Sequence, residues 1–142
     1  MVGKNKPLRR FVCWTLRKRP ELQIVGEASG GVEAFRKAEE LHPDLILLEI
    51  GLPTLHGIEA ARQMRKCAPE SKIVFLSHES GADMVQQAFE IGAGGYIAKT
   101  MVASDLLHAV EAVRKGKRFV SAGLSGYHFS ELSDLGNPRP PQ

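Results

Sequence analysis

The sequence predicts one α/β domain, a parallel sheet with helices packed on both faces. The first indication is a short apolar run, 45–48 and Ile50, which is typical of a strand buried on both faces. A second run of this kind covers 72–77. Segments with apolar residues at helical spacing alternate with such runs, and the connections between them are short. Strands that alternate with helices in this way favour parallel strands joined by helical crossovers.

The elements expected from the pattern run in a simple order. An amphipathic helix over 8–18 comes first and is ended by Pro20, because proline cannot continue a helix interior. A strand over 22–28 and a helix over 32–41, ended by His42 and Pro43, follow. The other expected elements are strands over 44–49, 72–77 and 96–99, helices over 58–67, 82–91 and 104–115, and a helix C-cap at Gly92. An opening helix is unusual for a doubly wound domain, which normally begins with a buried strand.

The domain is expected to cover residues 1–120. From about Ser121 the helical and strand patterns stop, and Ser, Gly and Pro dominate the composition. Such a segment buries too little apolar surface to fold by itself. We therefore predict that 121–142 is a flexible linker or a disordered tail.

Composition points to a cytoplasmic protein. The chain has 142 residues, enough for one hydrophobic core, and no apolar run approaches the roughly 18 residues that would span a membrane. The basic N-terminus has no apolar segment of the kind found in secretory signals. Cys13 and Cys67 lie far apart in helical patterns, which indicates reduced thiols rather than a disulfide or a metal pair.

The charge is distributed unevenly. Residues 1–19 contain seven basic residues and no acid, whereas the rest carries 12 basic and 16 acidic residues. A basic segment can contact nucleic acid or an acidic partner, and it can equally be the solvated face of a helix. The segment carries no recognised DNA-binding motif, so we do not expect this chain alone to bind nucleic acid.

Three polar residues follow three of the expected strands: Glu49, Ser77 and Lys99. Because the carboxyl ends of parallel strands meet at one edge of a sheet, these side chains are expected to share a crevice. Together they suit a phosphoryl group: the carboxylate can accept it, the hydroxyl can donate a hydrogen bond to it, and the ammonium group can neutralise its charge. Each also has a simpler interpretation: a solvated carboxylate, a strand-end cap and a surface lysine.

Four motifs in this order resemble the receiver domains of response regulators. The run 47–53, with Gly57 eight positions after Glu49, is similar to the phosphoacceptor strand and loop of that family. Ser77 matches its Ser/Thr, and 96–99 matches its aromatic-x-x-Lys motif. The sequence at 57–62 and 94–100 is most similar to that of receivers of the LuxR (NarL) type, which are usually fused to a helix-turn-helix domain.

The resemblance implies a flavodoxin-like (CheY-like), doubly wound fold with strand order 2-1-3-4-5. It implies a two-component phosphorelay protein, not an enzyme, in which an Asp at the position of Glu49 takes a phosphoryl group from a histidine kinase. Mg²⁺, held by an acidic pair after the first strand, neutralises the charge in that family. Ser77 and Lys99 would grip the phosphoryl oxygens, Tyr96 would turn inward as the switch, and Pro53 and Gly57 would shape the loop.

The sequence departs from the family at the acceptor and at the metal site. Glu49 is longer than Asp by about one C–C bond, roughly 1.5 Å. A displacement of about 1 Å at a reacting centre costs on the order of a hundredfold in rate. Gly3 and Lys4 stand where the acidic pair is expected. We therefore predict weak or absent Mg²⁺ binding, poor phosphotransfer, and a fixed ion pair between Glu49 and Lys99.

The first strand is also expected to be missing or reduced to a stub, since only Met1 and Val2 precede Gly3. In the family order this strand lies inside the sheet, so its loss would leave a gap or exposed strand edges. Residues 1–5, a partner chain or the tail would then fill the gap, or the product would be only marginally stable.

The leading hypothesis is a receiver-like domain that signals through protein contacts. Its surface would be the last two helices with the last strand, or the first and last helices, and its partner a histidine kinase or another signalling protein. A homodimer is left open, as is whether Glu49 mimics the phosphorylated state. The alternative is a fragment of a transcriptional regulator that binds DNA through the basic N-terminal segment or a lost helix-turn-helix.

Two further hypotheses have less support in the sequence. A flavodoxin-like enzyme would need a cofactor loop, and 92–95 is no phosphate loop because no Gly-Lys-Ser/Thr follows it. His56, His78 and Glu79 lie near Glu49 in the expected fold and are ligand types that zinc accepts. Loop histidines are usually solvated, so no metal site is expected.

Overall fold

A parallel sheet forms the centre of the computed structural model, which describes residues 1–50, 57–78 and 82–121. Within these residues the sheet has four strands in the order β1-β2-β3-β4. Their bounds are β1 (Leu45–Glu49), β2 (Lys72–Ser77), β3 (Gly95–Ala98) and β4 (Phe119–Val120), and each neighbouring pair is parallel. The helices are α1 (Lys6–Leu16), α2 (Gly31–Leu41), α3 (Gly57–Cys67), α4 (Ala82–Glu90) and α5 (Val102–Arg114), with the 3-10 helix η1 (Lys99–Met101) between β3 and α5.

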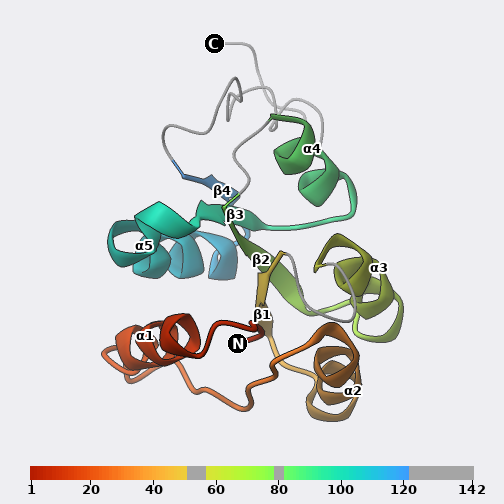
Figure 1. Ribbon diagram of the computed structural model, residues 1–142, viewed down its shortest axis with the longest axis horizontal. Helices are drawn as coiled ribbons and strands as arrows, with labels where there is room; N and C mark the ends of the chain where they lie inside the picture. Colours follow the sequence, from red (N-terminus) through yellow and green to blue (C-terminus); the bar gives the residue numbers. More distant parts are fainter. Residues whose placement is uncertain (51–56, 79–81, 122–142) are drawn as a thin grey trace.

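Helices cover both faces of the sheet, as the α/β pattern predicts. α1 and α5 lie on one face, and α2, α3 and α4 lie on the other (Figure 1). Alternate residues of β1 point to opposite faces, so Leu47 joins the core against α1 and α5, while Ile46 and Leu48 join the core against α2 and α3. The run in the sequence is continuously apolar because β1 contributes side chains to two cores, one on each face of the sheet.

The predicted helices are confirmed, with boundaries shifted by a few residues. α1 begins after Asn5, whose side-chain oxygen accepts a hydrogen bond from the N–H of Leu8 at 3.0 Å. It ends at Leu16, ahead of Pro20. α2 ends at Leu41, and its C-cap residue His42 adopts a left-handed conformation with φ 46° before Pro43. Gly92 has φ 99°, which fits its predicted place after α4.

The strand predictions need two corrections and one addition. The segment 22–28 is not a strand: its residues alternate between exposed and half-buried, but only Ala28 forms a β-bridge. A strand is defined by a ladder of hydrogen bonds to a neighbouring segment, and here the N-terminal segment pairs with 22–28 only through Val2. The last predicted strand ends at Ala98 because Lys99 begins η1. β4, which pairs with β3, was not predicted, since two residues carry no readable alternation.

Val2 lies between Ala28 and β1, with parallel bridges to Ala28 and to Leu48. Its N–H donates to the carbonyl of Leu47 at 2.7 Å, and its carbonyl accepts from the N–H of Glu49 at 2.9 Å. Taken in chain order, the first two extended segments and β1 to β3 therefore follow the order 2-1-3-4-5, with β4 added beyond the last. This is the order that the resemblance implies.

The described part of the predicted tail is Ser121. It is buried, and its N–H donates to the carbonyl of Tyr96 at 3.0 Å. Residues 122–142 lie outside the described residues, and so does the linker prediction for them. In the described residues, no helix has the length and apolarity needed to cross a membrane.

Candidate functional site

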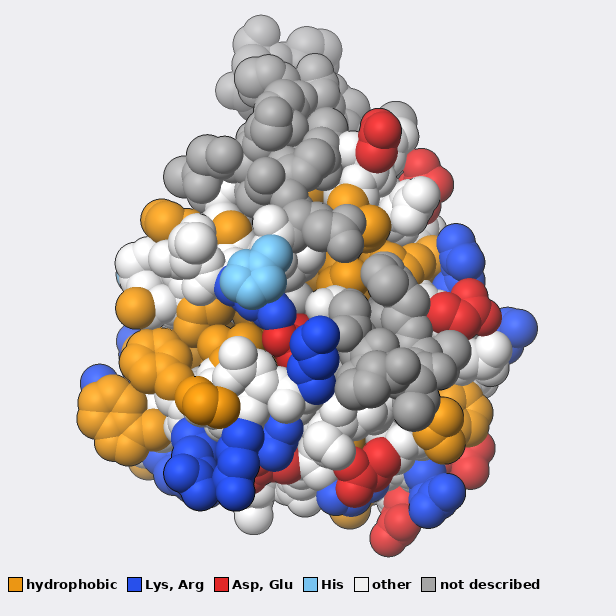
Figure 2. All heavy atoms as spheres, viewed as in Figure 1, with side chains coloured by type: hydrophobic (Ala, Val, Ile, Leu, Met, Phe, Trp, Pro, Cys, Tyr) orange, Lys and Arg blue, Asp and Glu red, His pale blue; other side chains and the backbone are white. Residues whose placement is uncertain are grey.

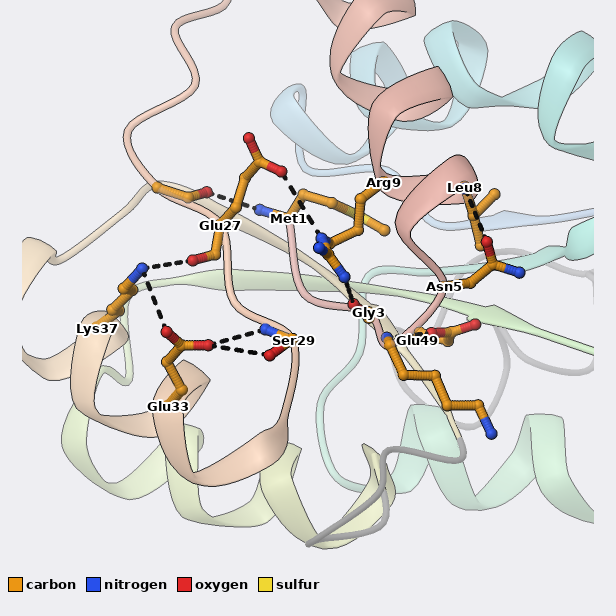
Figure 3. Close-up of polar contacts among 12 residues, drawn as sticks. Met1, Gly3, Asn5, Leu8, Arg9, Glu27, Ser29, Glu33, Lys37 and Glu49 are labelled. Atoms are coloured by element: carbon orange, nitrogen blue, oxygen red, sulfur yellow. Dashed lines mark hydrogen bonds and ion pairs between the residues drawn. The ribbon is translucent and has the colours of Figure 1, made fainter.

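Glu49 occupies the carboxyl end of β1, and its side chain is fully buried. One carboxylate oxygen, Oε1, accepts a hydrogen bond from the backbone N–H of Lys4 at 2.7 Å. The other, Oε2, forms an ion pair with the ammonium group of Lys99. The carboxylate lies beside Gly3 of the N-terminal segment (Figure 3). A charge removed from water in this way is stable only because both oxygens have partners.

Lys99 reaches Glu49 from two strands away. It follows β3, and β2 lies between β3 and β1, so its long side chain passes over the end of β2. Its side chain is 10% exposed, whereas that of Glu49 is 0% exposed. The predicted ion pair between these residues is confirmed. The sequence contained the two residues, and the order of the strands brought them together.

Ser77 and Tyr96 lie where the motifs predicted them. Ser77 ends β2, pairs in register with Ala98, and is buried. Tyr96 on β3 is fully buried, and its ring centroid is 6.3 Å from that of Phe75. Gly57 begins α3, while Pro53 lies outside the described residues. The carboxyl edge of β1, β2 and β3 therefore holds all three residues that were expected to share a crevice.

Gly3 and Lys4 contact the site through their backbones. The N–H of Gly3 donates to the carbonyl of Ala28 at 3.0 Å. A Cβ built on Gly3 would lie 2.9 Å from Oε1 of Glu49, closer than such atoms approach in proteins. Lys4 contributes its backbone N–H to the carboxylate rather than a contact from its ammonium group. The sequence marked these residues only as replacements for an acidic pair, and their packing against Glu49 required the structure.

Arg9 is a supporting residue that the sequence analysis did not single out. Its guanidinium group donates to the carbonyl of Gly3, and its Nε lies 3.8 Å from Oε1 of Glu27 (Figure 3). Arg9 thereby ties α1 to the segment that contacts Glu49. Its position among seven basic residues gave no sign of this role, since any of them could have faced solvent.

The residues present do not fit a Mg²⁺ ion. Mg²⁺ prefers near-octahedral oxygen coordination, usually with one or two carboxylates. Gly3 offers no side-chain ligand, and Lys4 and Lys99 place an N–H donor and a positive charge against the carboxylate of Glu49. Throughout 1–50, 57–78 and 82–121, no three His, Cys, Asp or Glu side chains are grouped to hold a metal ion. The alternative with His56 and Glu79 falls outside these residues.

Both cysteines are free thiols, as predicted. Burial raises the pKa of the Cys13 thiol and of the Cys67 thiol above the ordinary value. A raised pKa keeps a thiol protonated and weakly reactive. Neither cysteine is therefore suited to act as a nucleophile.

A family model for the response regulator receiver domain matches residues 2–111. The chain belongs to the response-regulator receiver family. This receiver domain is 31% identical over 136 residues to the transcriptional regulatory protein LiaR of Bacillus subtilis, covering 96% of this chain and 64% of LiaR. It is 33% identical over 125 residues to the nitrate/nitrite response regulator NarL of Escherichia coli, covering 88% of this chain and 58% of NarL. The receiver domain thus spans between half and two thirds of these relatives.

Solved structures agree on the fold of the receiver domain. A LuxR-family two-component response regulator from Aurantimonas superposes with a TM-score of 0.83 at 29% identity, covering 94% of this chain and 93% of that one. The response regulator domain of CheB from Thermotoga maritima gives a TM-score of 0.73 at 30% identity, over 80% of this chain and 90% of that one. The fold is CheY-like, and the family is a signalling module of two-component systems rather than an enzyme.

The basic segment forms one surface of the receiver domain. Figure 2 shows Lys and Arg side chains gathered over α1, beside hydrophobic side chains. Trp14 is 58% exposed and Phe11 is 37% exposed, and the ammonium group of Lys18 lies 4.0 Å from the centre of the Trp14 ring. Lys18 is thus engaged with an aromatic face, and Arg9 with Gly3 and Glu27. Part of the positive charge serves the fold of α1.

Proposed function

We propose that this receiver domain signals without accepting a phosphoryl group, because Glu49 and Lys99 form a fixed ion pair. The observation that carries the proposal is the state of the Glu49 carboxylate, which is fully buried with a partner on each oxygen. A carboxylate that attacks phosphorus must present a free oxygen to the donor. Here that would require loss of the Lys4 hydrogen bond or the Lys99 ion pair.

The metal site supports the same conclusion. In the family the acidic pair after the first strand holds Mg²⁺, which neutralises the transferred phosphoryl group. Gly3 and Lys4 stand at that place and cannot supply carboxylate ligands. We therefore regard this as a receiver with a degenerate phosphorylation site and a first strand reduced to the stub at Val2.

The arrangement of Lys99 and Tyr96 favours an activated-like state. In the family, Lys grips a phosphoryl oxygen and the aromatic residue turns inward after phosphorylation. Here Lys99 grips Oε2 of Glu49, and Tyr96 is fully buried. The longer arm of glutamate would thus stand in for part of a phosphoryl group. Signalling would pass through protein contacts in the cytoplasm, with a histidine kinase, another signalling protein or a second copy as the partner.

The test is phosphotransfer from acetyl phosphate and from a histidine kinase, each with Mg²⁺. The readout is a phosphate-affinity gel and the intact mass of the protein. We expect no phosphorylated wild-type protein and no gain from Glu49→Asp alone. Gain is expected only when Glu49→Asp is combined with Gly3→Asp and Lys4→Asp, which restore the acidic pair. Stable phosphorylation of the wild-type protein that disappears in Glu49→Gln would refute the proposal.

The alternative function is DNA binding through α1. The basic surface of α1 favours it, although Lys18 and Arg9 are engaged within the domain. Non-specific DNA binding weakens steeply as salt rises. A mobility shift at low salt that is lost on raising the salt, and lost in an Arg10→Gln and Arg17→Gln variant, would support this function. Absence of a shift at low salt would exclude it.

A further inference from the structure

The residues that follow α5 return to the sheet and pair with β3 (Figure 1). The N–H of Phe119, the first residue of β4, donates to the carbonyl of Gly94 at 3.1 Å. Two residues later, the N–H of Ser121 donates to the carbonyl of Tyr96 at 3.0 Å. These bonds hold the segment along the side of β3 that faces away from β2. We call residues 119–121, which are β4 and Ser121, the strap.

The hydroxyl of Ser121 joins the strap to both β3 and α5. It accepts a hydrogen bond from the N–H of Ala98, the last residue of β3, at 3.1 Å. It donates to Oδ2 of Asp105, in the first turn of α5, at 2.8 Å. Ser121 is 2% exposed, so water competes little for these bonds. The hydroxyl thus has a donor partner on one element and an acceptor partner on another.

These two bonds lie on either side of the 3-10 helix η1, which begins with Lys99. Ala98 directly precedes η1, and α5, which carries Asp105, directly follows it. A 3-10 helix has poorer hydrogen-bond geometry than an α-helix and is stable only in short pieces. The orientation of η1 therefore depends on what holds its two ends. Ser121 is bonded at both.

The orientation of η1 matters because Lys99 must reach Glu49. The Lys99 side chain extends over the end of β2 to a carboxylate that is fully buried. A shift of η1 that withdrew the ammonium group would leave this carboxylate in the interior without its cation, which is strongly unfavourable. The docked strap and the closed ion pair therefore require the same arrangement of η1.

We propose that Ser121 and Asp105 position Lys99 for the ion pair, so that docking of the strap on β3 and closure of the pair stabilise each other. The inference rests on the proposed function, in which the ion pair sets the signalling state. The chain continues directly from Ser121 to residue 122, so the strap passes the state of the pair to the segment that follows it. Such a coupling acts equally in both directions: pulling the strap from β3 weakens the ion pair, and loss of the ion pair loosens the strap.

The strap is suited to move while the rest of the sheet stays folded. β4 has two residues, and both Phe119 and Val120 are half-buried at the margins of the two cores. A short strand at the edge of a sheet has few ladder hydrogen bonds, so it opens at a lower cost in free energy than the whole domain. A local change at η1 can therefore reach the strap without global unfolding.

The first experiment measures how fast acetic anhydride modifies each lysine of the unphosphorylated protein, by peptide mass spectrometry. Lys99 should react slowly in wild type because its side chain is 10% exposed and paired. Ser121→Ala removes both hydroxyl bonds and should raise the rate at Lys99 at least about fivefold, the factor expected for loss of one hydrogen bond. The matched control is Ser71→Ala, which removes another buried hydroxyl, bonded to the carbonyl of Pro43, and should leave the rate at Lys99 unchanged.

Two variants of Asp105 separate positioning from simple packing. Asp105→Asn keeps an oxygen that can accept from the Ser121 hydroxyl, whereas Asp105→Ala removes the acceptor. We expect the modification rate of Lys99 to stay close to wild type in Asp105→Asn and to rise at least about fivefold in Asp105→Ala. Equal rates in the two variants would contradict the proposal.

The reverse direction is tested by amide hydrogen exchange at Phe119 and Ser121. Glu49→Gln removes the charge with which Lys99 pairs, and it should speed exchange at both amides at least about fivefold. Ser71→Ala is again the control and should leave both rates unchanged. This result would show that the strap responds to the ion pair and not to lowered stability in general.

Three results would overturn the proposal. These are a rate at Lys99 that does not change in Ser121→Ala, an equal rise at Lys99 in Ser71→Ala, and unchanged exchange at the strap in Glu49→Gln. None of these measurements uses a phosphoryl donor. Phosphorylation of the wild-type protein would therefore refute the proposed function alone, whereas independent behaviour of Lys99 and the strap would refute the coupling alone.

Discussion

Gly3 packs directly against the carboxylate of Glu49. A Cβ built on Gly3 would lie 2.9 Å from Oε1 and 3.4 Å from Cβ of Glu49. Oε1 has no room to retreat, because Lys4 and Lys99 hold the carboxylate and its side chain is fully buried. The longer acid at position 49 and the absent side chain at position 3 are therefore matched to each other.

Gly3→Ala is expected to destabilise the domain by about 1–3 kcal/mol, because it overpacks a buried contact. The free energy of unfolding is measured by urea denaturation. The control is the same change in a Glu49→Asp background, where the shorter side chain withdraws from position 3. We expect Gly3→Ala to cost much less there, giving a positive coupling in the double-mutant cycle. Equal costs in both backgrounds would show that the two positions are independent.

The ion pair of Glu49 and Lys99 should be asymmetric in its response to mutation. Lys99→Met leaves a fully buried carboxylate without its cation, and we expect a loss of about 3–5 kcal/mol. Glu49→Gln leaves Lys99, whose side chain is 10% exposed and so has access to water, and we expect about 1–2 kcal/mol. The double variant should be more stable than Lys99→Met. The prediction fails if Glu49→Gln proves the more harmful single change.

Ser121 is expected to belong to the folded domain. Its hydroxyl donates to Oδ2 of Asp105 at 2.8 Å and accepts from the N–H of Ala98 at 3.1 Å. Ser121→Ala removes both bonds, and we expect a loss of about 1–2 kcal/mol in the free energy of unfolding. Ser104→Ala, at an exposed position on α5, serves as the control and should cost less. An unchanged stability in Ser121→Ala would place the end of the domain before this residue.

The start of α2 should respond to acid through Glu33. A hydrogen bond from the backbone N–H of Ser29, at 2.9 Å, lowers the pKa of the Glu33 carboxyl, and nearby Lys37 adds to this (Figure 3). A carboxyl whose pKa is lower in the folded than in the unfolded protein stabilises the fold when the pH is above its pKa in the unfolded protein. That contribution is lost as the pH falls through its pKa in the folded protein.

The difference in stability between wild type and Glu33→Gln should therefore shrink as the pH falls through the acid range. It is measured by urea denaturation at several pH values. The amide introduced by Glu33→Gln keeps an oxygen for the Ser29 N–H but carries no charge. Glu70→Gln, at an exposed turn, is the control and should show no such trend. A constant difference for Glu33→Gln across the acid range would contradict the assignment.

Much of this domain was predictable from local patterns. The helices and β1 to β3 follow from apolar periodicity and from breakers such as Pro20, Pro43 and Gly92. These signals are local, so tertiary contacts shift an element's ends without removing it. The segment 22–28 failed because alternation of exposed and half-buried residues reports which side chains face the core. It does not report whether a neighbouring backbone is present to bond with.

The candidate site was predictable in part. Glu49, Ser77 and Lys99 were identified because parallel strands bring their carboxyl ends to one edge. The contacts of Gly3, the backbone N–H of Lys4 and the guanidinium group of Arg9 were not, since backbone donors and close approaches leave no mark in residue type.

By itself, the sequence determined an α/β receiver fold and an acceptor position occupied by glutamate, because periodicity and motif spacing are properties of the chain alone. The tertiary structure decided that this glutamate is buried and paired with Lys99. It also decided that Gly3 packs against the same carboxylate. These features depend on segments that are distant in sequence and meet only when the sheet forms.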